Sequence, residues 1–278
     1  MTGFSIDWLN LREEADRRAR DPGLLQQASR WLTPPPAGQA ESVVVDLGAG
    51  TGSTLRALCS KAGPVPAALK WRLVDHDPAL LAEAQRRHGD THRVEICPGD
   101  LAQPGSLPLE DARLVTASAL FDLVSAAFID KLIVALQSQN QEQRLGVYAA
   151  LNYDGSTAWT PPHPLDDAVL TAFNQDQQRD KGFGPALGPN ASSYLEFSLK
   201  NAGFQVSTAS SPWVLDAEDA SLTSALIEGI ASAVASDPQL NKTALEDWRR
   251  FRLENVPQGT CTVGHTDVLA LADAAGAD

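Results

Sequence analysis

Short runs of apolar residues alternate along the chain with segments whose apolar residues have helical spacing. The clearest run covers residues 42–47, where three consecutive valines favour a strand buried on both faces, as in the centre of a parallel sheet. Further strands are predicted at residues 71–75, 94–97, 112–118, 145–151, from 204, and at 261–272. Helices are predicted at residues 53–58, 79–87, 128–136, 166–179 and 193–201. The alternation predicts an α/β fold.

A glycine-rich turn directly follows the first predicted strand. Its glycines, Gly48, Gly50 and Gly52, allow a sharp strand-to-helix turn and let a ligand approach bare backbone. The dinucleotide fingerprint is G-x-G-x-x-G, whereas the spacing here is G-x-G-x-G, with Ser53 where the third small residue should be. We interpret this turn as the cofactor loop of a nucleotide-binding α/β domain.

The pattern hydrophobic-Asp-x-Gly-x-Gly-x-Gly at residues 45–52 resembles the first motif of the class I S-adenosylmethionine (SAM)-dependent methyltransferases. Later segments agree, because Asp75 ends the second predicted strand and Asp100 follows the third. An acid at the end of the second strand can accept two hydrogen bonds from ribose hydroxyls, a chemistry that alone does not separate SAM from NAD. The resemblance further implies that Asp100 bonds the adenine amino group and that Leu101 packs on the ring.

The resemblance also implies a fold and a cofactor. The expected fold is Rossmann-like: a seven-stranded, mostly parallel sheet with a C-terminal antiparallel strand, helices on both faces, and helical insertions that cap the site. The expected cofactor is SAM, with S-adenosylhomocysteine as product. The residues expected to bind it are Asp46, Gly48, Ala49, Gly50, Gly52, Asp75, His76, Asp100, Leu101, Ser118 and Ala119.

Composition and charge narrow the substrate class. The 278 residues carry a formal net charge of −13, which disfavours nucleic acid and anionic membranes as partners. We therefore expect a small-molecule acceptor. The three cysteines form no C-x-x-C pair and the histidines have no metal-ligand spacing, so no metal is expected. We find neither the apolar core of a signal peptide nor a membrane-spanning stretch, and we expect a cytoplasmic protein.

The chain divides into an N-terminal helical segment over the cofactor site, residues 1–38, and a methyltransferase domain, residues 39–278. Two insertions are predicted within this domain, at about residues 153–190 and 214–258. The N-terminal segment contains Arg12, Arg17 and Arg20, which can reach a cofactor carboxylate. For each of these arginines, a solvated helix face with i,i+4 acidic partners is the favoured interpretation.

A general base is needed only if the acceptor is protonated at the working pH. Candidates by location are Tyr153, Asp154 and His163, whereas a histidine in a terminal strand, His265, is expected to be structural. The acceptor atom stays open between O, N, C and S. Two alternative functions also stay open, an NAD-dependent oxidoreductase and a non-catalytic SAM-binding regulatory protein.

Overall fold

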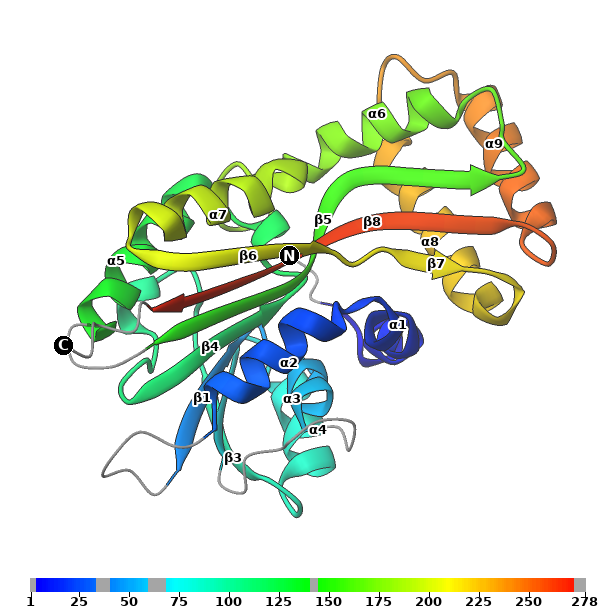
Figure 1. The fold of residues 1–278 in the computed structure, drawn as a ribbon. Coiled ribbons are helices and arrows are strands. Elements are labelled where there is room, and N and C mark those ends of the chain that lie inside the picture. The colour runs from blue at the N-terminus through cyan, green and yellow to red at the C-terminus, as the bar shows by residue number, and fades with distance from the viewer. Residues whose placement is uncertain (1–3, 34–40, 60–68, 141–144, 273–278) are drawn as a thin grey trace.

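The computed structural model describes residues 4–33, 41–59, 69–140 and 145–272, and they form one eight-stranded sheet with helices on both faces (Figure 1). The strands are β1 (Ser42–Leu47), β2 (Leu69–Asp75), β3 (Arg93–Pro98), β4 (Ala112–Ser118), β5 (Gly146–Thr160), β6 (Phe204–Ser210), β7 (Trp213–Leu215) and β8 (Thr260–Ala272). The strand order is β3-β2-β1-β4-β5-β8-β6, and β7 also pairs with β8.

Strand direction agrees with the expected fold class. Strands β1 to β5 pair in parallel, and β8 runs antiparallel to β5, β6 and β7. The Rossmann-like, mostly parallel sheet with a C-terminal antiparallel strand is therefore confirmed. The eighth strand, β7, is an addition to the seven that were expected, and it has only three residues.

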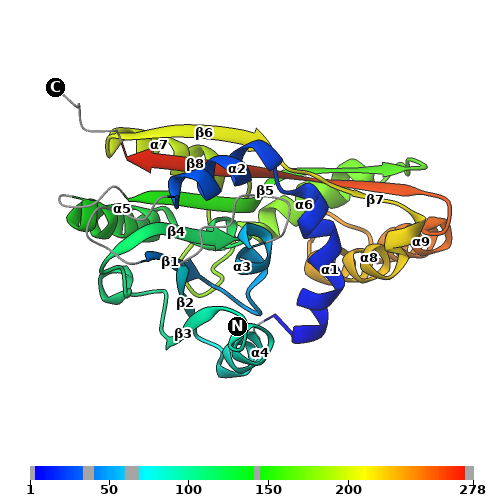
Figure 2. The same cartoon turned by 60° about the horizontal axis from the view of Figure 1, so that its bottom comes forward.

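Alternate residues of the central strands face two separate cores. Val43 and Val45 pack on the side of α5 (Ala126–Asn140) and α7 (Ala191–Asn201). Val44 packs on the opposite side, against four further helices. These are α1 (Ile6–Ala19), α2 (Pro22–Trp31), α3 (Ser53–Leu58) and α4 (Pro78–His88). Figure 2 shows the same two helical layers from a second direction.

Strand β5 continues well beyond the predicted end at residue 151. It runs to Thr160 and pairs with β8 along this extension, with register shifts on either side of Tyr153. Gly155 lies in the shifted stretch with φ +91°, and a Cβ there would lie 2.8 Å from Pro189. Residues 153–160, predicted to begin an insertion, therefore continue strand β5.

A third apolar cluster lies at the extended end of β5 and β8. It joins α6 (Asp166–Gln177), α8 (Ala220–Val234) and α9 (Lys242–Asn255), which lie in the upper right part of Figure 1. Its centre contains Ile227 and Trp248, both fully buried. These helices come from the two segments that were predicted as insertions.

The N-terminal segment forms two helices, and the break between them lies at Arg20 and Asp21. Asp21 accepts a hydrogen bond from the backbone N–H of Leu24 at 2.7 Å, and Pro22 occupies the first turn of α2. The predicted boundary between residues 38 and 39 lies outside the described residues. Among the residues that are described, no helix is both long and apolar enough to cross a membrane.

Candidate cofactor site

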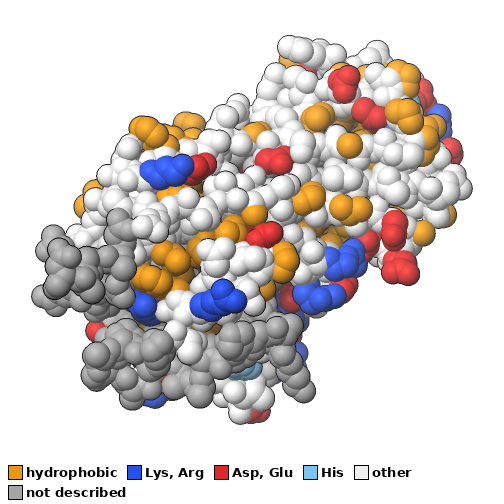
Figure 3. All heavy atoms as spheres, in the orientation of Figure 1, with side chains coloured by type: hydrophobic (Ala, Val, Ile, Leu, Met, Phe, Trp, Pro, Cys, Tyr) orange, Lys and Arg blue, Asp and Glu red, His pale blue; other side chains and the backbone are white. Residues whose placement is uncertain are grey.

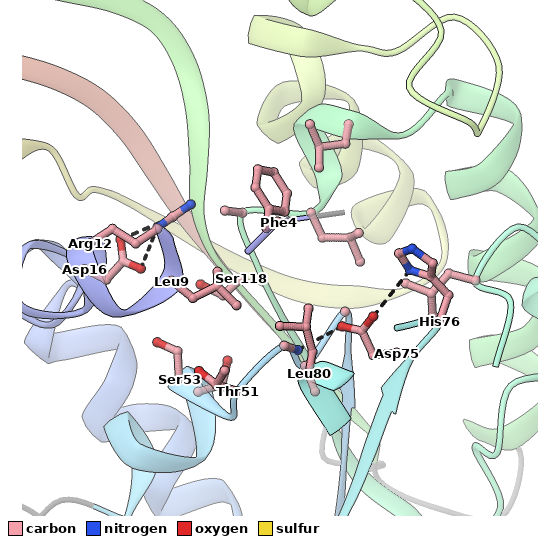
Figure 4. A pocket seen from close by; sticks show the side chains of 18 of the residues that line it. Phe4, Leu9, Arg12, Asp16, Thr51, Ser53, Asp75, His76, Leu80 and Ser118 are labelled. Carbon is pink, nitrogen blue, oxygen red and sulfur yellow. Dashed lines mark hydrogen bonds and ion pairs between the residues drawn. The ribbon is translucent and has the colours of Figure 1, made fainter. Parts of the chain in front are cut away.

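A cavity of about 430 Å³ opens at the carboxyl ends of the central strands, beneath α1 (Figure 4). Its walls come from the glycine turn, from the ends of β2, β3 and β4, from α1 and from the segment at residues 182–183. The lining residues are Phe4, Leu9, Arg12, Glu13, Asp16, Gly48, Ala49, Gly50, Thr51, Ser53, Thr54, Asp75, His76, Leu80, Asp100, Leu101, Ser118, Ala119, Leu120, Leu123, Gly182 and Phe183. Ligands of open α/β sheets bind at this edge.

The glycine turn adopts a conformation that L side chains rarely take. Gly48, Gly50 and Gly52 have φ values of +65°, +53° and +85°. A Cβ on Gly50 would lie 3.0 Å from Cδ1 of Leu9 on α1, so bare backbone lets the helix approach the turn. Gly52 does not line the cavity but packs against the ring of His88.

Asp75 connects the end of β2 to the glycine turn. Its Oδ2 accepts the backbone N–H of Gly50 at 2.9 Å, and its Oδ1 accepts the backbone N–H of Asp77 at 3.0 Å. Figure 4 shows the carboxylate at the cavity wall beside His76, whose Nδ1 lies 3.3 Å from Oδ1. Asp77 instead caps α4 through the backbone N–H of Ala79. Asp75 therefore lines the cavity, whereas Asp77 does not.

All the residues predicted to bind the cofactor line the cavity except Asp46 and Gly52. Asp46 lies beneath the glycine turn, where its Oδ1 accepts the hydroxyl of Thr116 at 2.6 Å and its Oδ2 is buried without a partner. Burial raises the pKa of Asp46 to about 6. This acid therefore supports the floor of the site from below.

The structure does not bring the three predicted base candidates to the cavity. Tyr153 is buried, donates its hydroxyl to Oδ1 of Asn174 at 2.9 Å, and has its pKa raised to about 12 by burial. Asp154 is exposed and accepts the hydroxyl of Ser156 at 2.6 Å. The His163 ring packs 5.0 Å from Phe251. The continuation of β5 carries Asp154 and His163 away from the site.

One face of α1 supplies residues of the site, although the sequence interpretation favoured a solvated face for its arginines. Its buried positions Arg12, Ala15, Asp16 and Ala19 have the spacing i, i+3, i+4, i+7 of a single helix face. Arg12 and Asp16 line the cavity and form a two-bond ion pair at 2.9 and 3.1 Å (Figure 4). Asp16 also accepts the indole N–H of Trp213 at 2.9 Å.

Arg17 on α1 and Arg20 at its C-cap differ in their surroundings, one on a solvated helix face and the other at the site. Arg20 is buried and donates to the hydroxyls of Ser118 at 2.9 Å and Ser53 at 3.2 Å, both at the cavity wall. Arg17 pairs with Glu14 on the solvent side, as expected for a solvated face. The solvated-face interpretation is therefore wrong for Arg12 and Arg20 and correct for Arg17.

Comparison with known proteins adds a fold assignment. No family model matches the chain. A curated relative, the non-reducing polyketide synthase pkiA of Emericella nidulans, is 30% identical over 87 residues, which cover 30% of this chain and 4% of that protein. The cyclopropane synthase MmaA2 of Mycobacterium tuberculosis is structurally similar, with a TM-score of 0.53 and 12% identity over 96% of this chain and 94% of that one.

A second solved structure is the phosphoethanolamine N-methyltransferase 2 of Haemonchus contortus, in complex with phosphomonomethylethanolamine and S-adenosylhomocysteine. It has a TM-score of 0.45 and 16% identity, over 90% of this chain and 52% of that one. The strand order and the similarity to MmaA2 together show that this chain has the fold of the class I SAM-dependent methyltransferases.

Proposed function

We propose that this chain is an enzyme that binds SAM in the cavity under α1 and transfers its methyl group to a small-molecule acceptor. The observation that carries the proposal is the joint placement of the glycine turn, Asp75 and Asp100 around one cavity. Asp75 would accept the ribose hydroxyls, and Asp100 and Leu101 would hold the adenine. The backbone at Gly48 to Gly50 and the hydroxyl of Ser118 would contact the methionine part.

The charge of the lining fits this cofactor. The acidic side chains are Glu13, Asp16, Asp75 and Asp100, and among the described lining residues the one arginine or lysine is Arg12, which is already paired with Asp16. An acidic cavity favours the sulfonium cation of SAM. The pyrophosphate of NAD would meet these carboxylates without a free cation to bind it, which disfavours the oxidoreductase alternative.

When bound, SAM would supply a methyl group on a sulfonium for an in-line displacement, with the electron pair of the C–S bond left on sulfur. The chain must align the acceptor with that methyl group and keep water out. Phe4, Leu123 and Phe183 provide apolar surface in the lining of the cavity. A volume of about 430 Å³ has to contain both cofactor and acceptor groups, which supports a small acceptor.

The outer surface is consistent with this acceptor class. On the face drawn in Figure 3, the Lys and Arg side chains of the described residues are interspersed with Asp and Glu side chains. A protein that binds nucleic acid through phosphate contacts presents a continuous basic face instead. The mixed surface and the charge of −13 therefore support a small molecule over a polynucleotide.

Thermal unfolding with added ligand tests the proposal. S-adenosylhomocysteine at a hundredfold excess over its Kd should stabilise the folded state by about 2.7 kcal/mol and raise the Tm by several degrees. NAD at the same concentration should leave the Tm unchanged. Stabilisation by NAD alone, or by neither ligand, contradicts the proposal.

A further inference from the structure

Two serines at the wall of the cavity share one buried guanidinium. Ser53 is the first residue of α3, and Ser118 is the last residue of β4. Both side chains line the cavity, and we call them the serine pair. Nη2 of Arg20 lies 2.9 Å from Oγ of Ser118 and 3.2 Å from Oγ of Ser53. Because both oxygens bond the same nitrogen, the two hydroxyls lie within reach of one small ligand group.

The fold holds Arg20 in place behind the serine pair. Arg20 is the C-cap of α1, where its backbone N–H bonds the carbonyl oxygen of Asp16, and it is only 4% exposed. The backbone N–H of Asp21 bonds Oδ2 of Asp267 at 3.0 Å, which ties this turn to β8. Burial opposes the charge of Arg20, but nearby polar groups, among them Tyr148 and Asp267, more than offset it and raise its pKa. The guanidinium therefore stays charged.

The bonds from Arg20 decide which way the serine hydroxyls act. A guanidinium only donates hydrogen bonds, so each serine oxygen accepts one and its own hydrogen is left to donate elsewhere. Within the part of the chain that the structure describes, neither hydroxyl donates to a protein acceptor. Since both side chains line the cavity, a ligand there can take these hydrogens. The serine pair thus offers two O–H donors to one ligand.

Two neighbouring donors with a positive charge behind them favour an anionic group. A carboxylate has two oxygens that only accept, whereas an ammonium group would bring a second positive charge towards Arg20. The acids that α1 contributes to the lining do not oppose this, because Asp16 is paired with Arg12 and Glu13 with Arg56. The local chemistry is therefore that of a carboxylate subsite.

The position of the serine pair relates this subsite to the cofactor. Figure 4 shows Ser53 and Ser118 on one side of the cavity and Asp75 on the other. In SAM the ribose lies between the adenine and the methionine part. A ribose at Asp75 therefore leaves the methionine carboxylate free to extend towards the serine pair.

We propose that the serine pair binds the methionine carboxylate of SAM and that Arg20 is a positioning residue that orients both hydroxyls towards it. The proposal rests on the proposed function and specifies how the same cavity recognises its cofactor. Arg20 does not line the cavity and acts through the two hydroxyls. The subsite discriminates SAM and S-adenosylhomocysteine from ligands that have the same adenosine half and no carboxylate.

Two matched ligands test the subsite: S-adenosylhomocysteine and its decarboxylated form, in which hydrogen replaces the carboxylate. Calorimetry gives both Kd values for the full chain, and their ratio is the carboxylate selectivity. Wild type should bind S-adenosylhomocysteine more than tenfold tighter. Ser53→Ala and Ser118→Ala should each lower the selectivity at least threefold, and the double variant should bring it close to one. The Kd of the decarboxylated ligand should stay within twofold of wild type, whereas a loss of structure would weaken both ligands.

Variants of Arg20 test its positioning role. Arg20→Gln should lower the selectivity at least fivefold and leave the Kd of the decarboxylated ligand unchanged. In the double serine variant the same change should have no further effect on selectivity, because Arg20 acts through the hydroxyls. If Arg20→Gln does not fold, Arg20→Lys takes its place. It keeps a cation, but its ammonium ends one bond short of Nη2, so the selectivity should fall at least threefold.

The controls separate the possible failures. Ser138→Ala on the exposed side of α5 and Arg17→Gln on the solvent side of α1 should leave both Kd values unchanged. Failure of wild type to bind either ligand overturns the proposed function and this inference with it. Equal binding of both ligands by wild type, or equal weakening of both in the serine variants, overturns the carboxylate subsite alone. Wild-type selectivity in the Arg20 variant overturns the positioning role.

Discussion

At the scale of single residues, Asp75 has two tasks. It fixes the glycine turn through the N–H of Gly50 and keeps its carboxylate at the cavity wall for a ligand. Asp75→Ala removes both, so S-adenosylhomocysteine binding should weaken by about 1–3 kcal/mol, the scale of hydrogen bonds to a charged group. Isothermal titration calorimetry measures this directly.

Asp77→Ala is the matched control, because it removes a carboxylate two residues away. It should cost about 0.5–2 kcal/mol of stability through the lost cap of α4 and leave the affinity unchanged. The assignment of the ribose to Asp75 is wrong if the two variants show the opposite pattern.

Burial of His265 makes the unfolding free energy depend on pH. Its pKa of about 4 in the folded protein lies below the ordinary histidine value of 6.5, so folding favours the neutral ring. This stabilisation is complete above pH 6.5 and is lost as the pH falls toward 4. Between pH 7.5 and 4.5, wild type should lose about 2–3 kcal/mol more unfolding free energy than His265→Gln.

Urea unfolding of both proteins at the two pH values gives that difference. Asp46 and Asp122, whose pKa values are raised, change stability in the opposite direction as the pH falls. They do so in both proteins, so their effect cancels in the comparison. An equal pH dependence of the two proteins would show that His265 is not buried in its neutral form.

At the scale of elements, the glycine turn and α1 form one unit. Gly50→Val places a branched side chain at φ +53° and against Leu9, 3.0 Å from the new Cβ. Binding of S-adenosylhomocysteine should fall at least 100-fold, because α1 and the ligand both approach this backbone. Gly105→Val, at a glycine with open space around it, should bind normally. Normal binding by Gly50→Val would mean that the cofactor loop lies elsewhere.

The elements that the sequence predicts best are those whose pattern is local. The strands at residues 42–47 and 112–118 match β1 and β4, because both faces of each are mostly buried and each contains a short run of apolar residues. The extension of β5 was missed because Asn152 to Gly155 has the composition of a turn. Its strand conformation depends on pairing with β8, more than 100 residues later in the chain.

The residues of the candidate site also differ in how well the sequence predicts them. The glycine turn, Asp75 and Asp100 are predictable because each directly follows a strand and carries its own signal. Arg12 and Asp16 were not, because a charged i,i+4 pair is typical of solvated helices. The clue was Ala15 and Ala19 on the same face, since small residues there indicate close packing.

At the scale of the whole molecule, the described residues form three apolar clusters that stabilise different parts of the fold. Two lie on the faces of the sheet and hold the strand ends that form the cavity. The third joins α6, α8 and α9 on the extension of β5 and β8. Apart from Trp213, which bonds Asp16, the segments flanking this third cluster supply few contacts to the cofactor cavity. Cofactor binding should therefore depend on the sheet clusters and not on the third.

Two substitutions of equal size test this division. Ile227 in the third cluster and Leu55 behind the glycine turn are both fully buried, and each loses the same number of carbon atoms on change to alanine. Each variant should lose about 2–5 kcal/mol of stability in urea unfolding. Well below their Tm, Ile227→Ala should bind S-adenosylhomocysteine with the wild-type Kd, whereas Leu55→Ala should bind several-fold more weakly because α3 carries the turn. Equal weakening in both would show that the third cluster is coupled to the cofactor site, and would make α6, α8 and α9 part of the binding machinery.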